Sequence, residues 1–377
     1  MSSVPKKSIH IAHEKLVDFS SDVGSLWAQP VKILSELPSP LSFMRDYVAL
    51  SRPFIVRNAF PRISLDDLIS QLSTNPDLTL NVDVTPDGFG DCIRELEDGE
   101  KVFILPETRS IGFVEFVNDL RKQRKEPAPC VEFIDLDENQ LPILSHKYLR
   151  SIADDERKGI MYYSRQNDCL RQELQPLVEL FPTSIDFADE AFNAEPDAVN
   201  LWIGNEKSVS SMHKDHYENL YCVSSGEKVF TLCPPGDALF LKDIKLSSAQ
   251  FYYDDSQKCW HVRRNMNENV IWMESNVEML LNSNDEDQAE YIGKNPLLQH
   301  VHPMKVTLSA GDMFYLPALW YHRVTQSEET VAVNYWYDFN FLSPSWIYFN
   351  MLQQVNPDGN EFNKGNDGVC TPKTVTL

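Results

Sequence analysis

Five short runs of β-branched and aromatic residues limit the folds that are open to this chain. They lie between residues 198 and 339 and are bounded by Gly, Pro, Ser and Asp residues that favour turns. Short strands joined by tight turns are typical of antiparallel barrels and sandwiches. We therefore predict a mainly β core over about residues 198–340. The five runs are AVNLWIG, NLYCVSS, EKVFTLCPP, MKVTLSAGDMFYLP and TVAVNYWYDF.

The chain before this core has a different pattern. Apolar positions recur at helical spacing through residues 11–50, and three prolines divide the segment. We therefore expect a helical lead-in over residues 1–50. From residue 51 onward, short alternating runs such as LTLNVDVT and KVFILPE appear between helical stretches. We assign residues 51–340 to one domain in which helices flank the β core.

Two later segments are expected to lie outside the core strands. Residues 265–299 are rich in Asn, Glu and Asp and are interpreted as an insertion between strands. The run SPSWIYFNMLQQV favours an amphipathic helix that packs against the core or against a second copy of the chain. Residues 341–377 are therefore predicted to form a C-terminal helix followed by a disordered tail.

Net charge narrows the range of partners. The chain has 34 Lys and Arg against 56 Asp and Glu, a formal charge of −22. Such a surface repels phosphate backbones and anionic lipids, so we expect neither nucleic acid nor membrane as a main partner, whereas a basic polypeptide would be attracted. The N-terminal segment lacks the apolar stretch of a signal peptide. We expect a soluble cytoplasmic protein, with the nucleus as a second location.

The cysteines argue against one common kind of metal site. All seven are scattered along the chain, and no two form a C-x-x-C pair. This usage suits a reducing compartment and disfavours zinc bound by cysteine. We interpret the cysteines as mostly structural thiols.

The stretch SSMHKDHYENLYCVSSGEK (residues 210–228) contains candidate metal ligands of another kind. On a strand, residues i and i+2 face the same side, so His213 and Asp215 would project together. The later sequence AGDMFYLPALWYHRV offers His322 as a third ligand on another strand of the same barrel. Two histidines and a carboxylate leave adjacent coordination positions open, as in non-haem Fe(II) oxygenases. An isolated His-x-Asp is usually a pair of surface residues, but the surrounding strand pattern favours a metal site here.

These motifs carry a resemblance to a known family. The segments PDAVNLWIG, SMHKDHYENLYCVSSGEKVF, PALWYH and AVNYWYD resemble the jumonji-C family of Fe(II)- and 2-oxoglutarate-dependent oxygenases. The similarity covers about residues 50–340 and is strongest to the lysyl hydroxylase subgroup called jumonji-C domain protein seven. It implies a double-stranded β-helix, the cupin or jelly-roll fold. It also implies Fe(II) bound by His213, Asp215 and His322, the three residues that strand geometry selects.

The resemblance also implies residues that hold the cosubstrate. A bound 2-oxoglutarate leaves one carboxylate deep in the barrel, and a buried anion without a partner costs several kcal/mol. Lys228 matches the family lysine that pairs with this carboxylate. Tyr163 and Ser210 match positions that donate hydroxyl hydrogen bonds to it, and serine stands where close relatives often have threonine. Asn219 and Asn334 match amides that line the pocket, although each could also be a core asparagine with internal partners.

The resemblance further implies an activity. A 2-oxoglutarate-dependent dioxygenase of this subgroup consumes dioxygen and hydroxylates a lysine side chain in a protein. The implied substrate is a developmentally regulated GTP-binding protein of the translation-factor class. Two alternatives stay open: a jumonji-C histone-lysine demethylase, and a non-catalytic cupin-like binding protein. The chain has no zinc-binding module or chromatin-reader segment, which disfavours the first, and its complete ligand set disfavours the second.

Overall fold

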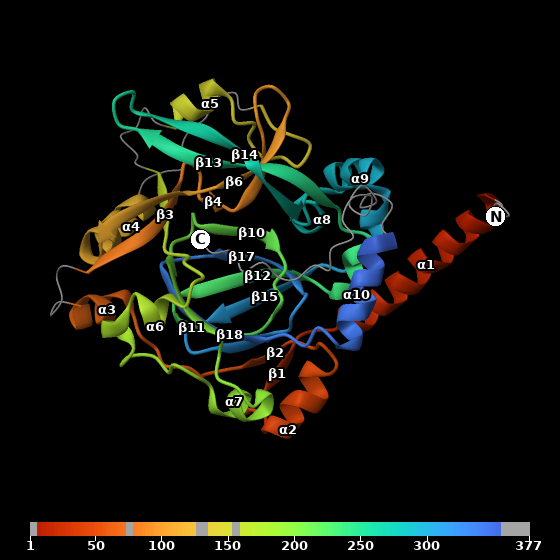
Figure 1. Cartoon of the computed structure of the whole chain (residues 1–377), viewed down its shortest axis with the longest axis horizontal. Helices are drawn as coiled ribbons and strands as arrows, with labels where there is room; N and C mark the ends of the chain where they lie inside the picture. The colour runs from red at the N-terminus through yellow and green to blue at the C-terminus, as the bar shows by residue number, and fades with distance from the viewer. Residues whose placement is uncertain (1–5, 73–77, 126–134, 153–158, 356–377) are drawn as a thin grey trace.

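The computed structural model describes most of the chain between residues 6 and 355 (Figure 1). The described ranges are 6–72, 78–125, 135–152 and 159–355. Among these residues, no helix combines the length and the apolar character that crossing a membrane requires.

Two sheets form the core of the protein. In the described residues, one has six strands in the order β1-β2-β16-β11-β18-β9, and the other has five in the order β15-β12-β17-β10-β4. This architecture confirms the predicted jelly-roll core. The first sheet consists of β1 (Lys32–Leu34), β2 (Phe54–Val56), β16 (Met313–Leu316), β11 (Tyr217–Ser225), β18 (Thr330–Asp338) and β9 (Ala198–Gly204). The second consists of β15 (Met304–Ser309), β12 (Glu227–Cys233), β17 (Tyr321–Gln326), β10 (Val209–His213) and β4 (Phe89–Gly90).

An aromatic layer joins the two sheets. Phe230 of β12 packs edge-on against Tyr221 of β11 and Phe314 of β16, with ring centroids 5.0 and 5.4 Å apart. The opposite face of the first sheet packs against a second cluster that includes Phe43 and Phe187 from flanking helices. Because the first sheet is covered on both faces, every residue of β9 is buried.

Two smaller sheets extend the structure beside β10 (Figure 1). The insertion predicted at residues 265–299 does not begin between strands. Its first residues lie in β14, which continues to Met273 as part of the β13–β14 hairpin. One sheet contains β14 (Cys259–Met273), β13 (Asp243–Asp254), β6 (Lys101–Leu105) and β5 (Cys92–Glu95). The other contains β7 (Glu107–Gly112), β3 (Thr79–Thr85) and β8 (Ile160–Tyr162).

Helices flank the β core as predicted. The N-terminal α1 reaches away from the barrel at its outer end (Figure 1), and both α1 and α10 pack on the short η3. The lead-in is not wholly helical, because β1 pairs in parallel with β2 and joins the core sheet. The predicted tail lies outside the described residues. The helices are α1 (Lys6–Trp27), α2 (Pro40–Phe43), η1 (Met44–Val48), α3 (Leu65–Leu72), α4 (Phe113–Lys125), α5 (His146–Ser151), α6 (Cys169–Gln172), η2 (Gln175–Leu177), α7 (Asp186–Phe192), η3 (Pro235–Leu239), α8 (Glu278–Asn282), α9 (Asp285–Lys294), η4 (Pro296–His300) and α10 (Pro344–Val355).

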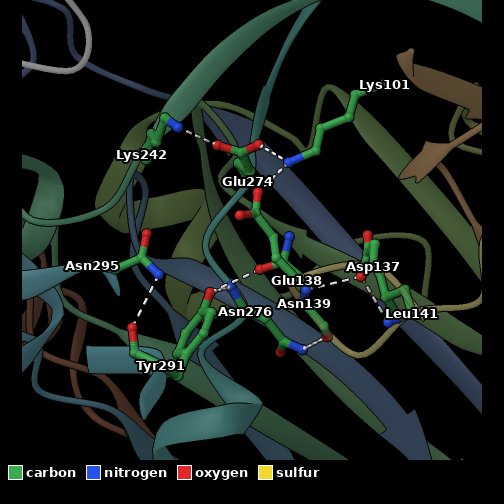
Figure 2. Close-up of polar contacts among 10 residues, drawn as sticks. All are labelled: Lys101, Asp137, Glu138, Asn139, Leu141, Lys242, Glu274, Asn276, Tyr291 and Asn295. Carbon is green, nitrogen blue, oxygen red and sulfur yellow. Dashed lines mark hydrogen bonds and ion pairs between the residues drawn. The ribbon is translucent and has the colours of Figure 1, made fainter. Parts of the chain in front are cut away.

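A polar network fixes the end of β14 (Figure 2). Glu274, the residue after this strand, lies between Lys101 and Lys242, with nitrogen to oxygen distances of 2.6 Å to each. Beside it, the Tyr291 hydroxyl lies 2.9 Å from the side-chain oxygen of Asn139. These contacts tie segments that are distant in sequence, so they hold the β13–β14 hairpin in place over β10.

A buried carboxylate organises the turn between β16 and β17. Glu218 of β11 accepts hydrogen bonds from the Tyr315 hydroxyl at 2.5 Å and from the Ala318 amide at 3.2 Å. The next amide, that of Leu319, donates to the Asp215 carbonyl at 2.9 Å. The turn is thereby held against the segment that contains Asp215. Burial raises the pKa of Glu218 to about 7, although its two hydrogen bonds lower it in part.

We predict that Glu218→Gln removes part of the pH dependence of stability. In the native protein the raised pKa keeps the proton on Glu218 between about pH 5 and about pH 7, where the unfolded chain has lost it. The free energy of unfolding should therefore fall by on the order of 2 to 3 kcal/mol across this range in the wild type, and less in the variant. Urea unfolding at both pH values measures this, and parallel profiles for the two proteins would contradict it.

Candidate metal centre

The three predicted ligands meet at one end of the barrel. Their ligand atoms lie within 4.8 Å of one another. Strands β10 and β17 are antiparallel, and their register places His213 directly opposite His322. Asp215 joins them from the turn after β10, with its Oδ2 3.9 Å from His213 Nε2 and 3.6 Å from His322 Nε2. The strand itself ends at His213, so the turn, and not strand alternation, brings Asp215 to this side.

Hydrogen bonds orient both imidazole rings. His213 Nδ1 lies 2.7 Å from the Ser211 carbonyl, and His322 Nδ1 lies 3.0 Å from the Trp320 carbonyl. Because a carbonyl only accepts, each Nδ1 is the donor and each Nε2 keeps its lone pair toward Asp215. Burial and the charge of His213 lower the pKa of His322 to about 4, against the opposing effects of Asp215 and the Trp320 carbonyl. The ring is therefore neutral at pH 7, as metal binding requires.

Trp272 supports the centre from the β13–β14 hairpin. Its indole stacks on the His213 ring with centroids 5.9 Å apart and an interplanar angle of 12°. Its Nε1 donates to the Ser211 hydroxyl at 3.2 Å. This tryptophan was not among the predicted site residues, because nothing in the sequence indicates that β14 packs beside β10. The network around Glu274 positions it.

Lys228 is buried beside Tyr162, a residue that lines the pocket with the metal ligands. Its side chain is 1% exposed, and burial lowers its pKa to about 7. Within the described part of the chain, its hydrogen-bond partner is the neutral hydroxyl of Tyr162, 3.1 Å away. A buried ammonium with only a neutral partner is unfavourable unless an anion pairs with it. The pocket is thus suited to a carboxylate.

The tyrosine in this pocket is Tyr162 and not the predicted Tyr163. Neighbouring strand residues point to opposite faces, and the Tyr163 hydroxyl lies on the other side, 3.4 Å from Glu173. Tyr162 lines the pocket together with Ser210, whose hydroxyl hydrogen-bonds to it. The hydroxyl that lies in this pocket is therefore that of Tyr162, whereas the Tyr163 hydroxyl faces Glu173.

The two predicted asparagines lie in the same pocket. Asn334 donates from Nδ2 to the Asn219 side-chain oxygen at 3.3 Å, and its own oxygen accepts from Trp202 Nε1 at 2.8 Å. Both asparagines are buried and line the pocket with the metal ligands. This chain of hydrogen bonds fixes the orientation of both amides.

The donor set fits one class of cofactor. Two imidazole nitrogens and one carboxylate oxygen occupy one side of a metal and suit Fe(II), with the remaining positions open. The cation of Lys228 fits the distal carboxylate of 2-oxoglutarate, a dicarboxylate that also chelates iron. The residues present therefore match both groups.

Comparison with known proteins places the chain in a family. A family model described as a cupin-like domain matches residues 40–343. The human bifunctional peptidase and (3S)-lysyl hydroxylase JMJD7 is 32% identical over 328 residues, which cover 86% of this chain and 89% of the relative. The chain belongs to the cupin-like jumonji-C family of oxygenases.

Two further members of the jumonji-C family have about the same sequence identity to this chain. The JmjC domain-containing protein E of Dictyostelium discoideum is 31% identical over 349 residues, covering 85% of this chain and 87% of the relative. The lysine-specific demethylase JMJ32 of Arabidopsis thaliana is 32% identical over 329 residues, covering 84% of each chain. Members with different named activities are thus about equally similar to this chain, and identity alone does not decide between hydroxylation and demethylation.

We predict that Lys228→Met separates cosubstrate binding from metal binding. Losing one partner of a buried ion pair costs about 3 to 5 kcal/mol, so the affinity for 2-oxoglutarate should fall at least about a hundredfold. Metal binding should survive, because the three ligands are unchanged. Without cosubstrate, the variant should be as stable as the wild type or more stable, because it no longer buries a charge without an anionic partner.

Calorimetric titration of 2-oxoglutarate into the Mn(II)-loaded protein measures this affinity. The control is Lys305→Met, which removes a partly exposed lysine on β15. Equal affinities for the two variants would contradict the assigned role of Lys228.

Proposed function

We propose that this protein is an Fe(II)- and 2-oxoglutarate-dependent hydroxylase that acts on a lysine side chain of another protein. The observation that carries the proposal is the coincidence of an intact ligand triad with Lys228, a buried cation with no anionic partner among the described residues. A binding protein without catalysis would need neither. The human relative is named a (3S)-lysyl hydroxylase, which supports lysine as the target.

The finer identity of the substrate is also proposed. The resemblance to the lysyl hydroxylase subgroup favours a developmentally regulated GTP-binding protein of the translation-factor class. The formal charge of −22 favours a basic partner segment and is consistent with a lysyl target.

The residues of the site would have different roles in this reaction. When bound, the iron and 2-oxoglutarate supply the oxidising chemistry by which an oxygen atom of dioxygen enters a C–H bond. His213, Asp215 and His322 would hold the metal, while Lys228 and Tyr162 would hold the far carboxylate of the cosubstrate. Trp272 keeps the His213 ring in a fixed plane. The protein thus contributes position and the exclusion of water.

The second candidate function is histone-lysine demethylation. The name of the Arabidopsis relative supports it, and its identity of 32% equals that of the human hydroxylase. The two reactions differ in their products. An alcohol on a side-chain carbon is stable, whereas an alcohol on an N-methyl carbon collapses to formaldehyde and the methyl group is lost.

We predict that the enzyme adds one oxygen atom to an unmethylated lysine. With Fe(II), 2-oxoglutarate and a lysine peptide from a GTP-binding protein, mass spectrometry should show the added mass of a single oxygen. Asp215→Ala should abolish the product with the fold retained, because this partly exposed side chain contributes little to the core. Formaldehyde release from methylated histone peptides, with no oxygen added to the GTPase peptide, would establish demethylation instead.

We further propose a homodimer that forms through the C-terminal helix α10. Its inner face is buried by Phe349 and Leu352, whereas Ile347 and Met351, one turn apart, are 64% and 42% exposed. The outer face of α1 continues this apolar surface, since Phe19 is 54% exposed and its ring lies 6.3 Å from that of Tyr348. A contiguous apolar face on two adjacent helices favours a second copy as the partner.

We predict that the double substitution Ile347→Glu and Met351→Glu produces a monomer of unchanged fold. Charges on the exposed face would be buried without partners in the dimer, yet they would remain in water in the monomer. Light scattering measures the mass of each protein. Lys122→Glu, at an exposed position on α4, changes the net charge by the same amount; it is the control and should leave the dimer intact. A wild type that is already monomeric would rule out this interface.

A further inference from the structure

A second cavity opens beside the metal centre. It shares Gln166 and Trp336 with the pocket that contains the three ligands, so the two spaces are contiguous. Its walls come from β3, β4–β5, β9, β18 and the segment after β8. Because the inner pocket is matched to metal and cosubstrate, a substrate side chain would have to approach from a neighbouring cavity such as this one.

Several of the residues that line the cavity are carboxylates, but most of these have partners already. Asp168 is paired with Arg171 at 2.7 Å, and Asp197 accepts from the Tyr217 hydroxyl at 3.2 Å. Asp83 accepts from the Ser164 hydroxyl at 2.6 Å and feels the positive charge of Arg165. These groups shape the cavity and have little capacity left for a cation.

Asp91 differs from the other carboxylates. In the described structure, no hydrogen bond reaches its side chain, whereas its backbone carbonyl accepts from the Ser211 hydroxyl. That bond, together with the pairing of β4 to β10, fixes Asp91 close to the strand that ends in His213. Burial and the charge of Asp83 raise its pKa to about 6, and the nearby His213 lowers it. A cation in the cavity would relieve both unfavourable effects.

Trp336 is an independent sign of a ligand in this cavity. The residue is only 7% exposed, and its indole Nε1 has no hydrogen-bond partner among the described residues. Its ring is held by stacking on Tyr217, with centroids 4.8 Å apart and planes at 5°. A buried N–H without an acceptor is costly, and Trp336 is one of the residues that line both pockets. It suits an acceptor such as a peptide carbonyl oxygen.

We infer that the outer cavity is the substrate site, in which Asp91 binds the ammonium of the target lysine and Trp336 Nε1 donates to a carbonyl of the substrate backbone. This inference rests on the proposed lysyl hydroxylase function and adds the residues that recognise its substrate. Asp91 would favour a substrate side chain that carries a positive charge. Trp336 would bind the substrate backbone, and so would contribute equally whatever the target side chain is. Neither residue binds the metal or the cosubstrate.

Peptide binding tests the inference without relying on turnover. Two peptides are compared on protein loaded with Mn(II) and 2-oxoglutarate in the absence of oxygen. One contains the target lysine, and the other has norleucine, which keeps the chain length but lacks the ammonium. Wild type should prefer the lysine peptide, and Asp91→Asn should reduce that preference at least about tenfold. Asp255→Asn, an exposed position on the β13–β14 turn, is the matched control and should change nothing.

Trp336→Phe keeps the stacked ring but removes the N–H. It should weaken both peptides equally, by about threefold to tenfold, and leave the preference for lysine unchanged. An unchanged lysine preference in Asp91→Asn overturns the role of Asp91, and unchanged affinities in Trp336→Phe overturn that of Trp336. Affinity for 2-oxoglutarate is measured in parallel and should not change, which separates loss of the substrate site from loss of fold.

The hydroxylation assay distinguishes failure of this inference from failure of the proposed function. If wild type hydroxylates the lysine peptide but Asp91→Asn retains full selectivity, the function stands and the inference falls. If Asp91 sets the preference in binding but no oxygen is added to the lysine peptide, the recognition site stands and the hydroxylase proposal falls.

Discussion

The antiparallel pairing of β10 with β17 is the interaction on which the site depends. It sets His213 directly opposite His322, so two imidazoles converge from strands whose histidines are more than a hundred residues apart in sequence. Asp215 is then held by the turn after β16, whose Leu319 amide bonds its carbonyl and whose Ala318 amide bonds Glu218. The pairing of β10 with β17 therefore positions the two histidines, and the side chain of Glu218 holds the turn between β16 and β17 against Asp215.

Two buried ionisable groups near the metal centre carry charges of opposite sign. Lys228 lies inside with a pKa lowered by burial, whereas Asp91 lies in the outer cavity with a pKa raised by burial. Each is therefore charged at a cost that a partner of opposite sign would offset. A dicarboxylate inside and a cationic side chain outside satisfy both groups at once. If the proposed function holds, electrostatics would order the two occupants along the path to the metal.

Strand arguments from the sequence succeeded where local alternation or a specific motif was enough. The β core and the helices at both ends were predicted in this way, and the three residues predicted as ligands lie together in the structure. The reasoning was less exact at the ends of strands. Asp215 reaches the site from a turn, and β1 adds a strand to a segment expected to be helical. A single step at the end of β8 moved the hydroxyl in the pocket from the predicted Tyr163 to Tyr162, because neighbours on an extended segment face opposite sides.

The sequence by itself determined which side chains can bind a metal, because the histidines and the carboxylate occur in long, specific motifs on predicted strands. It also indicated a β barrel or sandwich, since short apolar runs with tight turns have few other ways to bury their faces, and the resemblance to the jumonji-C family implied the jelly-roll class. Only the tertiary structure decided that Trp272 stacks on His213, and that Asp91 and Trp336 line one cavity. Those contacts join segments far apart in the chain, and no periodicity in the sequence records which distant strands will pack together.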